Sequence, residues 1–129
     1  MRSLLDANVV LRYLLRDDEA AAELARAHVE AGAFLLPEVL CEVVYVLEGV
    51  YEVPRTELCG FLTGLINETI CPDGDVLKTA LAIYKGRGKL DFVDCILAAR
   101  HQVSGDRVLT FDRKLNGALA RIDETGTAV

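Results

Sequence analysis

Apolar and polar positions along the chain fall into two patterns, short apolar runs and longer stretches with helical spacing. The short runs are bounded by polar or turn-forming residues, which is typical of buried strands. They predict strands at residues 3–5, 33–36, 69–71, 107–111 and 118–122. The pattern therefore predicts a chain that returns repeatedly to one sheet.

The stretches between these runs place apolar residues three and four positions apart, as on the buried face of a helix. Asp17, Asp73 and Asp91 suit helix N-caps, and Pro37 suits a first helical turn. Helices are predicted at 9–15, from Asp17 to Gly32, at 37–50, at 55–66, after Asp73 and after Asp91. Strands that alternate with helices indicate an α/β fold, with a central parallel sheet of about five strands and helices on both faces.

Four acids take comparable positions on this outline. Asp6 interrupts the apolar stretch LLDANVVLRYLL at the end of the first run, and Asp112 follows the run 107–111. Glu42 lies in the first two turns of the helix that follows the second run, and Asp94 lies in the first turn of the helix that Asp91 opens. Because the carboxyl ends of parallel strands share one edge of a sheet, we expect the four carboxylates to meet there.

Four carboxylates at one edge need a counter-charge. Two of them about 4 Å apart repel by roughly 4 kcal/mol at an effective dielectric of about 20. Ligands that are all oxygen, without His or Cys, favour a hard cation such as Mg²⁺ or Mn²⁺. An ion of this kind activates water and stabilises the oxygens of a phosphodiester during its displacement.

Each acid also has a structural interpretation. Asp91 and Asp94 are spaced as an N-cap and an acid that compensates the helix dipole. Glu38 and Glu42 share a helix face, and periodicity does not choose between them. Asp112 suits the cap of a turn or short helix. Asp6 has the weakest structural explanation, because its neighbours are core residue types.

Length and composition place the chain in one globular class. Its 129 residues, with 52% hydrophobic and 26% charged, predict a single domain over residues 1–129. No apolar run is long enough to cross a membrane and no signal peptide is visible, so the expected compartment is the cytoplasm. The four cysteines form no CxxC pair, which argues against a zinc site.

The net charge of −6 argues against a nucleic-acid-binding protein unless the charges are unevenly distributed. Two groups of basic residues flank the predicted acidic edge. The first precedes Asp91 and consists of Lys85, Arg87 and Lys89. The second follows Asp112 and consists of Arg113 and Lys114. They predict a basic rim that contacts RNA. The alternative is that they are ordinary solvated loop residues.

Four blocks of the sequence together resemble the PIN-domain family, and within it the VapC-type toxins of toxin–antitoxin pairs. The blocks follow the family order over nearly the whole chain. They are LLDANVVLRYLLRDD, LLPEVLCEVVYVLEGVY, KLDFVDCILAARH and VLTFDRKL. The family acids fall on Asp6, Glu42, Asp94 and Asp112.

The resemblance implies a metal-dependent endoribonuclease that cuts RNA with water as the nucleophile. By the same resemblance the four acids bind Mg²⁺ or Mn²⁺, with Asp91 as a supplement. Asn8 and Thr110 would orient carboxylates or a water. A VapC-type toxin is also expected to be a homodimer and to be held by a VapB-like antitoxin.

Two other functions compete with this interpretation. A phosphatase of the haloacid-dehalogenase type would use Asp6 as nucleophile, but it expects a second acid where this chain has Asn8. A PIN-like scaffold that only binds proteins would tolerate loss of an acid, and all four acids are present.

Overall fold

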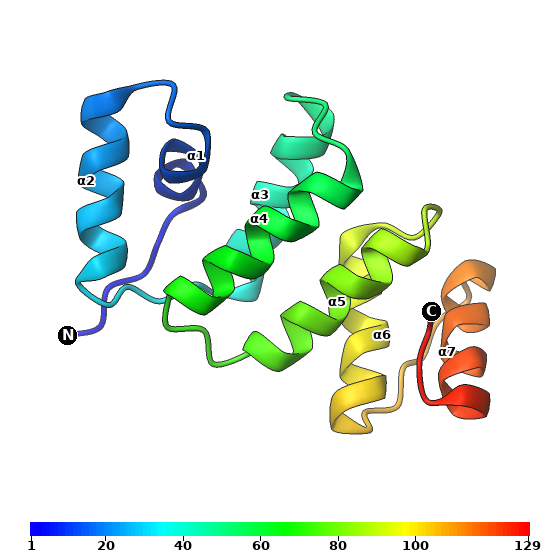
Figure 1. Cartoon of the computed structure of the whole chain (residues 1–129). Helices are drawn as coiled ribbons and strands as arrows, with labels where there is room; N and C mark the ends of the chain where they lie inside the picture. Colours follow the sequence, from blue (N-terminus) through cyan, green and yellow to red (C-terminus); the bar gives the residue numbers. More distant parts are fainter. The chain divides into compact units, whose positions relative to one another are not determined.

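A computed structural model describes all 129 residues, Met1–Val129, and consists of helices joined by loops (Figure 1). Seven helices follow one another along the chain. They are α1 (Ala7–Leu15), α2 (Glu19–Glu30), α3 (Pro37–Gly49), α4 (Arg55–Glu68), α5 (Gly74–Gly86), α6 (Phe92–Ser104) and α7 (Arg113–Thr125). None of them combines the length and the apolar character that crossing a membrane requires.

The chain divides into two compact units, Met1–Gly74 and Asp75–Val129. The first unit holds α1 to α4, and the second holds α5 to α7, with Gly74 of α5 at the boundary. In the first unit α1 packs against α2 and α3, and α3 against α4. In the second unit α6 packs against α7.

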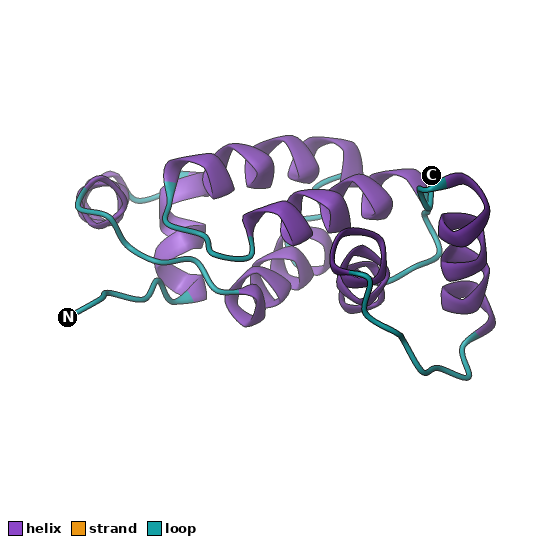
Figure 2. Ribbon diagram, turned by 90° about the horizontal axis from the view of Figure 1, so that it is seen from below, coloured by secondary structure: helices purple, strands orange, loops and turns teal.

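The prediction of a central parallel sheet of about five strands, with helices on both faces, is wrong. Every element in Figure 2 is a helix or a loop. Only two isolated parallel bridges form, between Leu4 and Phe34 and between Phe34 and Ile70. The α/β classification is therefore replaced by an all-helical one.

The three bridged segments are the predicted strands at 3–5, 33–36 and 69–71, and each has only one bridged residue. The amide of Leu5 donates to the carbonyl of Phe34 at 2.9 Å, and the amide of Leu35 donates to the carbonyl of Ile70 at 3.0 Å. Helices start directly after the first two segments, at Ala7 and Pro37, and α4 ends at Glu68, directly before the third. The ladders end there because helical backbone cannot continue them.

The other two predicted strands are wrong for different reasons. Residues 107–111 form an irregular loop between α6 and α7. Residues 118–122 belong to α7, where Leu115, Ala118, Leu119 and Ile122 are buried. Those four positions have helical spacing. The five residues 118–122 are too few to distinguish that spacing from the pattern of a strand.

Helix signals in the sequence are mostly confirmed. Asp91 and Asp112 are N-caps, and Pro37 occupies the first turn of α3. The cap of α2 is Asp18 rather than Asp17, with its carboxylate accepting from the amide of Ala21 at 3.1 Å. A side-chain acceptor at this position satisfies an otherwise unpaired amide of the first turn.

The second unit has its own apolar interior. The rings of Tyr84 on α5 and Phe92 on α6 meet edge to face, with centroids 5.5 Å apart. Arg87, just after α5, donates from Nε to the carbonyl of Ala128 at 2.7 Å. That bond ties the segment after α7 to the end of α5, and Ala128 is itself buried.

We predict that Leu35→Ala lowers the free energy of unfolding by about 2–5 kcal/mol, because Leu35 is fully buried and truncation leaves a cavity. Urea denaturation measures the loss. Leu24→Ala is the matched control, since Leu24 is 67% exposed and its truncation should change stability by no more than about 0.5 kcal/mol. Equal effects of the two substitutions would contradict the packing described for the first unit.

Candidate functional site

Asp91 and Asp94 form one acidic pair at the beginning of α6. The Asp91 carboxylate accepts from the amide of Asp94 at 2.8 Å, so it caps the helix as its spacing predicted. Asp94 is partly buried in the first turn, whereas Asp91 is exposed. The cap therefore holds the two carboxyl groups at the same end of one helix.

Asp112 is placed in the same way at the beginning of α7. Its carboxylate accepts from the amide of Leu115 at 2.9 Å, and its own amide donates to Oγ1 of Thr110 at 3.0 Å. The side chain of Asn116 donates to the carbonyl of Thr110 at 3.1 Å. Thr110 thus positions the backbone of Asp112, while its predicted role beside a carboxylate or a water stays a prediction.

The pKa of Asp94 lies above its ordinary value. Burial raises it most, followed by the negative charges of Asp91 and Asp112 and by a hydrogen bond with the Asp91 side chain. Because α6 packs against α7, the two helix beginnings bring together acids that are 18 or more positions apart in sequence. The placement of these acids follows from helix packing and not from a sheet edge, and the expected meeting of all four family acids stays a prediction.

Asp6 and Glu42 belong to the first unit. Asp6 is the exposed N-cap residue of α1, but its side chain makes no capping hydrogen bond. Glu42 is exposed on α3, and Asn8 is exposed on the first turn of α1. Asp6 is therefore not a charge buried in a core segment, and its meeting with the acids of the second unit stays a prediction.

The chemistry of the donor set suits Mg²⁺ or Mn²⁺, because all the acids offer hard carboxylate oxygens. A cation would also offset the negative charges of Asp91 and Asp112, which add to burial in raising the pKa of Asp94. However, no group of three or more His, Cys, Asp or Glu side chains is arranged to hold a metal ion. The donors fit the ion in kind, and the structure does not gather them into a ligand set.

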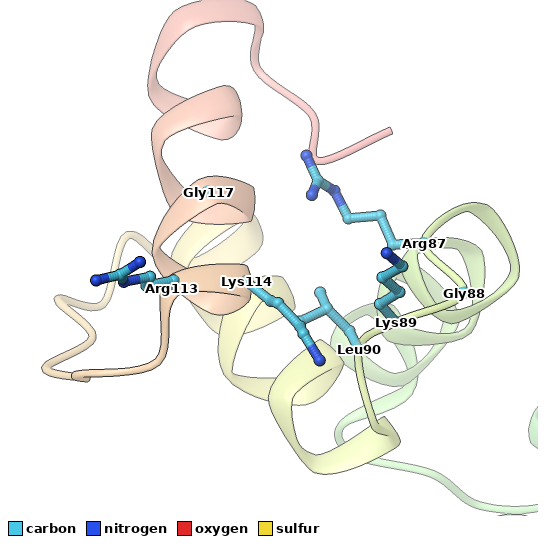
Figure 3. Close-up of a pocket in the computed structure, with 7 residues that line it drawn as sticks. All are labelled: Arg87, Gly88, Lys89, Leu90, Arg113, Lys114 and Gly117. Atoms are coloured by element: carbon cyan, nitrogen blue, oxygen red, sulfur yellow. The ribbon is translucent and has the colours of Figure 1, made fainter.

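A basic pocket lies in the second unit (Figure 3). Its volume is about 330 Å³, and its lining consists of Arg87, Gly88, Lys89, Leu90, Arg113, Lys114 and Gly117. Four of the five predicted RNA-contacting residues thus line one cavity, and Lys85 does not. Leu90 directly precedes Asp91 and Arg113 directly follows Asp112, so the pocket adjoins the acids along the chain.

The basic side chains of the pocket differ in what they can do. Figure 3 shows Lys114 reaching from α7 toward Leu90, whereas Arg113 projects from the opposite side of the helix. Arg87 already donates from Nε to the carbonyl of Ala128. Lys89 and Lys114 are both exposed, so they are the better probes of ligand binding.

The sequence patterns missed a histidine clamp in the second unit, toward the C-terminal ends of α6 and α7. His101 on α6 contacts the carbonyl of Asp106 through Nδ1 at 2.8 Å and the carboxylate of Asp123 through Nε2 at 2.7 Å. Both partners are acceptors only, so the protonated ring, which donates from both nitrogens, satisfies both. The clamp joins α6, α7 and the loop that leads to Asp112. No local signal in the sequence pairs residues 101 and 123.

Comparison with known proteins assigns the chain to a family. The PIN domain family matches residues 3–123, which is nearly the whole chain and spans both compact units. The chain belongs to the PIN-domain family. PIN domains are generally nucleases, so hydrolysis of nucleic acid is the activity that membership supports. No curated protein and no solved structure matches the chain significantly.

We predict a pH-dependent contribution of His101 to the stability of this PIN domain. The bonds to Asp106 and Asp123 raise the pKa of His101 above its ordinary value of 6.5. Its stabilising effect is therefore complete below that value and is lost as the pH rises through the folded-state pKa. His101→Gln should lower the melting temperature more at pH 5.5 than at pH 8.5.

The control for this measurement is His28→Gln, which removes an exposed imidazole from α2 in the first unit. It reports any effect of the substitution that is unrelated to the clamp. A loss for His101→Gln that is the same at both pH values would contradict a charged clamp.

Proposed function

We propose that this PIN domain is a metal-dependent endoribonuclease that hydrolyses RNA phosphodiester bonds. The observation that carries the proposal is the placement of Asp91, Asp94 and Asp112 at the beginnings of α6 and α7, two helices that pack against each other. A basic pocket adjoining these acids supports a polyanionic substrate. Family membership supports the nuclease chemistry.

In this proposal Asp6, Glu42, Asp94 and Asp112 hold Mg²⁺ or Mn²⁺, with Asp91 as a supplement. The ion, when bound, makes water a better nucleophile and offsets negative charge on the phosphodiester. Asp94 is central because it is partly buried and feels both neighbouring carboxylates. Thr110 and Asn116 keep the backbone of Asp112 in place. Asn8 would orient a carboxylate or a water from α1.

The basic pocket handles the substrate. Exposed Lys89 and Lys114 are available to contact phosphates, while Arg87 combines a structural bond with a charge at the rim. Lys85 and Arg113 would extend the positive surface beyond the pocket. The positive charge is local, which reconciles RNA binding with the net charge of −6.

We further propose that the chain acts as one PIN domain and is the toxin of a VapBC-type pair. The four ordered sequence blocks around Asp6, Glu42, Asp94 and Asp112 support this assignment. A cognate VapB-like antitoxin and a homodimer are its expected partners. Suppression of cleavage by the product of a small neighbouring reading frame would support the toxin role.

One observation favours a second candidate, a non-catalytic PIN-like scaffold that binds proteins. As the chain stands, no three acidic or other ligand side chains are arranged around a common ion position. A scaffold needs no such arrangement. The two functions differ in whether purified protein cleaves RNA and in whether that cleavage needs a divalent ion.

We predict that the purified chain cleaves single-stranded RNA with Mg²⁺ or Mn²⁺ and not with EDTA. Asp94→Asn and Asp6→Asn should each lower the cleavage rate about 100-fold or more, a typical loss when a charge-stabilising group is removed. Gel analysis of end-labelled RNA measures the rate. Asp75→Asn is the matched control, because Asp75 is an exposed acid at the beginning of α5, outside the proposed set.

Three outcomes separate the candidates. Cleavage that persists in both Asp94→Asn and Asp6→Asn would mean that the site is elsewhere. Cleavage that is unaffected by EDTA would remove the metal from the proposal. Absence of cleavage across a broad RNA pool, with binding retained, would favour the scaffold.

We predict that Lys89→Ala combined with Lys114→Ala weakens RNA binding and lowers its salt dependence. Each lost phosphate contact on a single strand should reduce the slope of log K against log salt by roughly 0.7. Fluorescence anisotropy in EDTA measures binding without cleavage. Lys78→Ala, an exposed lysine of α5 that does not line the pocket, is the control. An unchanged slope in the double variant would exclude the pocket as the RNA surface.

A further inference from the structure

The loop between α6 and α7 exposes two large apolar side chains. Leu109 is 82% exposed and Phe111 is fully exposed, whereas Val108 before them and Thr110 between them are partly buried. Arg107 continues the exposed row at the next alternate position. An outward row of one cation and two apolar side chains is unusual for a protein surface and marks an interaction site.

Contacts at both ends hold this loop in place. The carbonyl of Asp106 contacts Nδ1 of His101 at 2.8 Å, and the carbonyl of Thr110 accepts from Asn116 at 3.1 Å. Oγ1 of Thr110 also accepts from the amide of Asp112. These bonds restrain the backbone on both sides of the exposed pair Leu109 and Phe111.

The row borders a hollow of about 420 Å³ that is lined by Arg107, Val108, Leu109, Thr110, Phe111 and Asn116. This volume falls within the range of small-ligand sites. The lining combines an aromatic ring, aliphatic carbon, a guanidinium and amide and hydroxyl groups. A nucleobase with its phosphate has the matching surfaces, a flat ring, polar edges and a negative charge.

We propose that Phe111 is a stacking platform for an unpaired base of single-stranded RNA, with Leu109 and Arg107 completing the contact. This inference rests on the proposed ribonuclease function and adds to it a contact for an unpaired base. Base stacking on an exposed aromatic ring requires a base that is not paired in a duplex. Double-stranded RNA would therefore be a poor ligand for this loop.

Phe111 lies next to the candidate site in the sequence, so a base stacked on it would have a role in placing the substrate. Asp112, one of the three converging acids, directly follows Phe111, and Arg113 of the basic pocket comes next. A base held on Phe111 would bring the neighbouring phosphodiester to the beginning of α7. Charge complementarity favours RNA over an apolar protein segment, because the charged residue among those that line the hollow is Arg107.

The test compares the affinity of wild type and Phe111→Ala for a labelled 12-nucleotide polyuridylate, measured by anisotropy in EDTA with the full-length chain. Loss of one stacked base should weaken binding roughly 10-fold, within the range of stacking energies. The slope against salt should not change, because no phosphate contact is removed. Phe111→Trp should restore the affinity.

A second probe isolates the base. An abasic strand of equal length carries the same phosphates without rings, so wild type and Phe111→Ala should bind it equally. Leu24→Ala is the control for removal of an exposed apolar side chain far from the loop in sequence. Circular dichroism checks that each variant is folded, and light scattering measures its oligomeric state.

Each contrary outcome has one meaning. Equal affinity of wild type and Phe111→Ala for polyuridylate would overturn the stacking platform and leave the ribonuclease intact. A change of oligomeric state in Phe111→Ala without a change in RNA affinity would assign the loop to a second copy of the chain and also overturn it. Failure of wild type to bind any RNA would overturn the proposed function and the platform together.

Discussion

Packing of α6 against α7 is the constraint on which the candidate site at the beginnings of these helices depends. Asp91 and Asp112 are held there because each caps its own helix, and packing of α6 on α7 brings them within electrostatic reach of Asp94. The structural and the functional interpretations of these acids are therefore compatible. A capping bond occupies one carboxylate oxygen and leaves the other for a ligand.

The charge distribution of the second unit follows from the same helix ends. The residues just before Asp91 and just after Asp112 are basic, so a positive pocket adjoins the acidic cluster. A negative centre beside a positive surface suits a substrate whose phosphates must approach carboxylates. The net charge of −6 describes the whole chain and does not report this local arrangement.

The sequence indicated most helices and the acids but misjudged the sheet. The segments at 3–5, 33–36 and 69–71 do approach one another in parallel, yet each contributes one bridged residue because a helix starts or ends next to it. The run 118–122 is too short to show helical spacing by itself, because the buried positions of α7 begin at Leu115. In the run 107–111, apolar character did not mean burial, since Leu109 and Phe111 face solvent. A hydrophobic run indicates that its residues favour apolar contacts, but it does not show which other segment they contact.

The sequence by itself determined where helices begin and which chemistry is available, because caps, proline and acidic residues act through neighbouring backbone groups. It therefore identified Asp91, Asp94, Asp112 and the basic residues beside them. Only the tertiary structure decided which of these meet, that His101 joins residues 106 and 123, and that Phe111 is left outside. Such contacts depend on how segments far apart in the sequence pack together, and local sequence patterns contain no information about that packing.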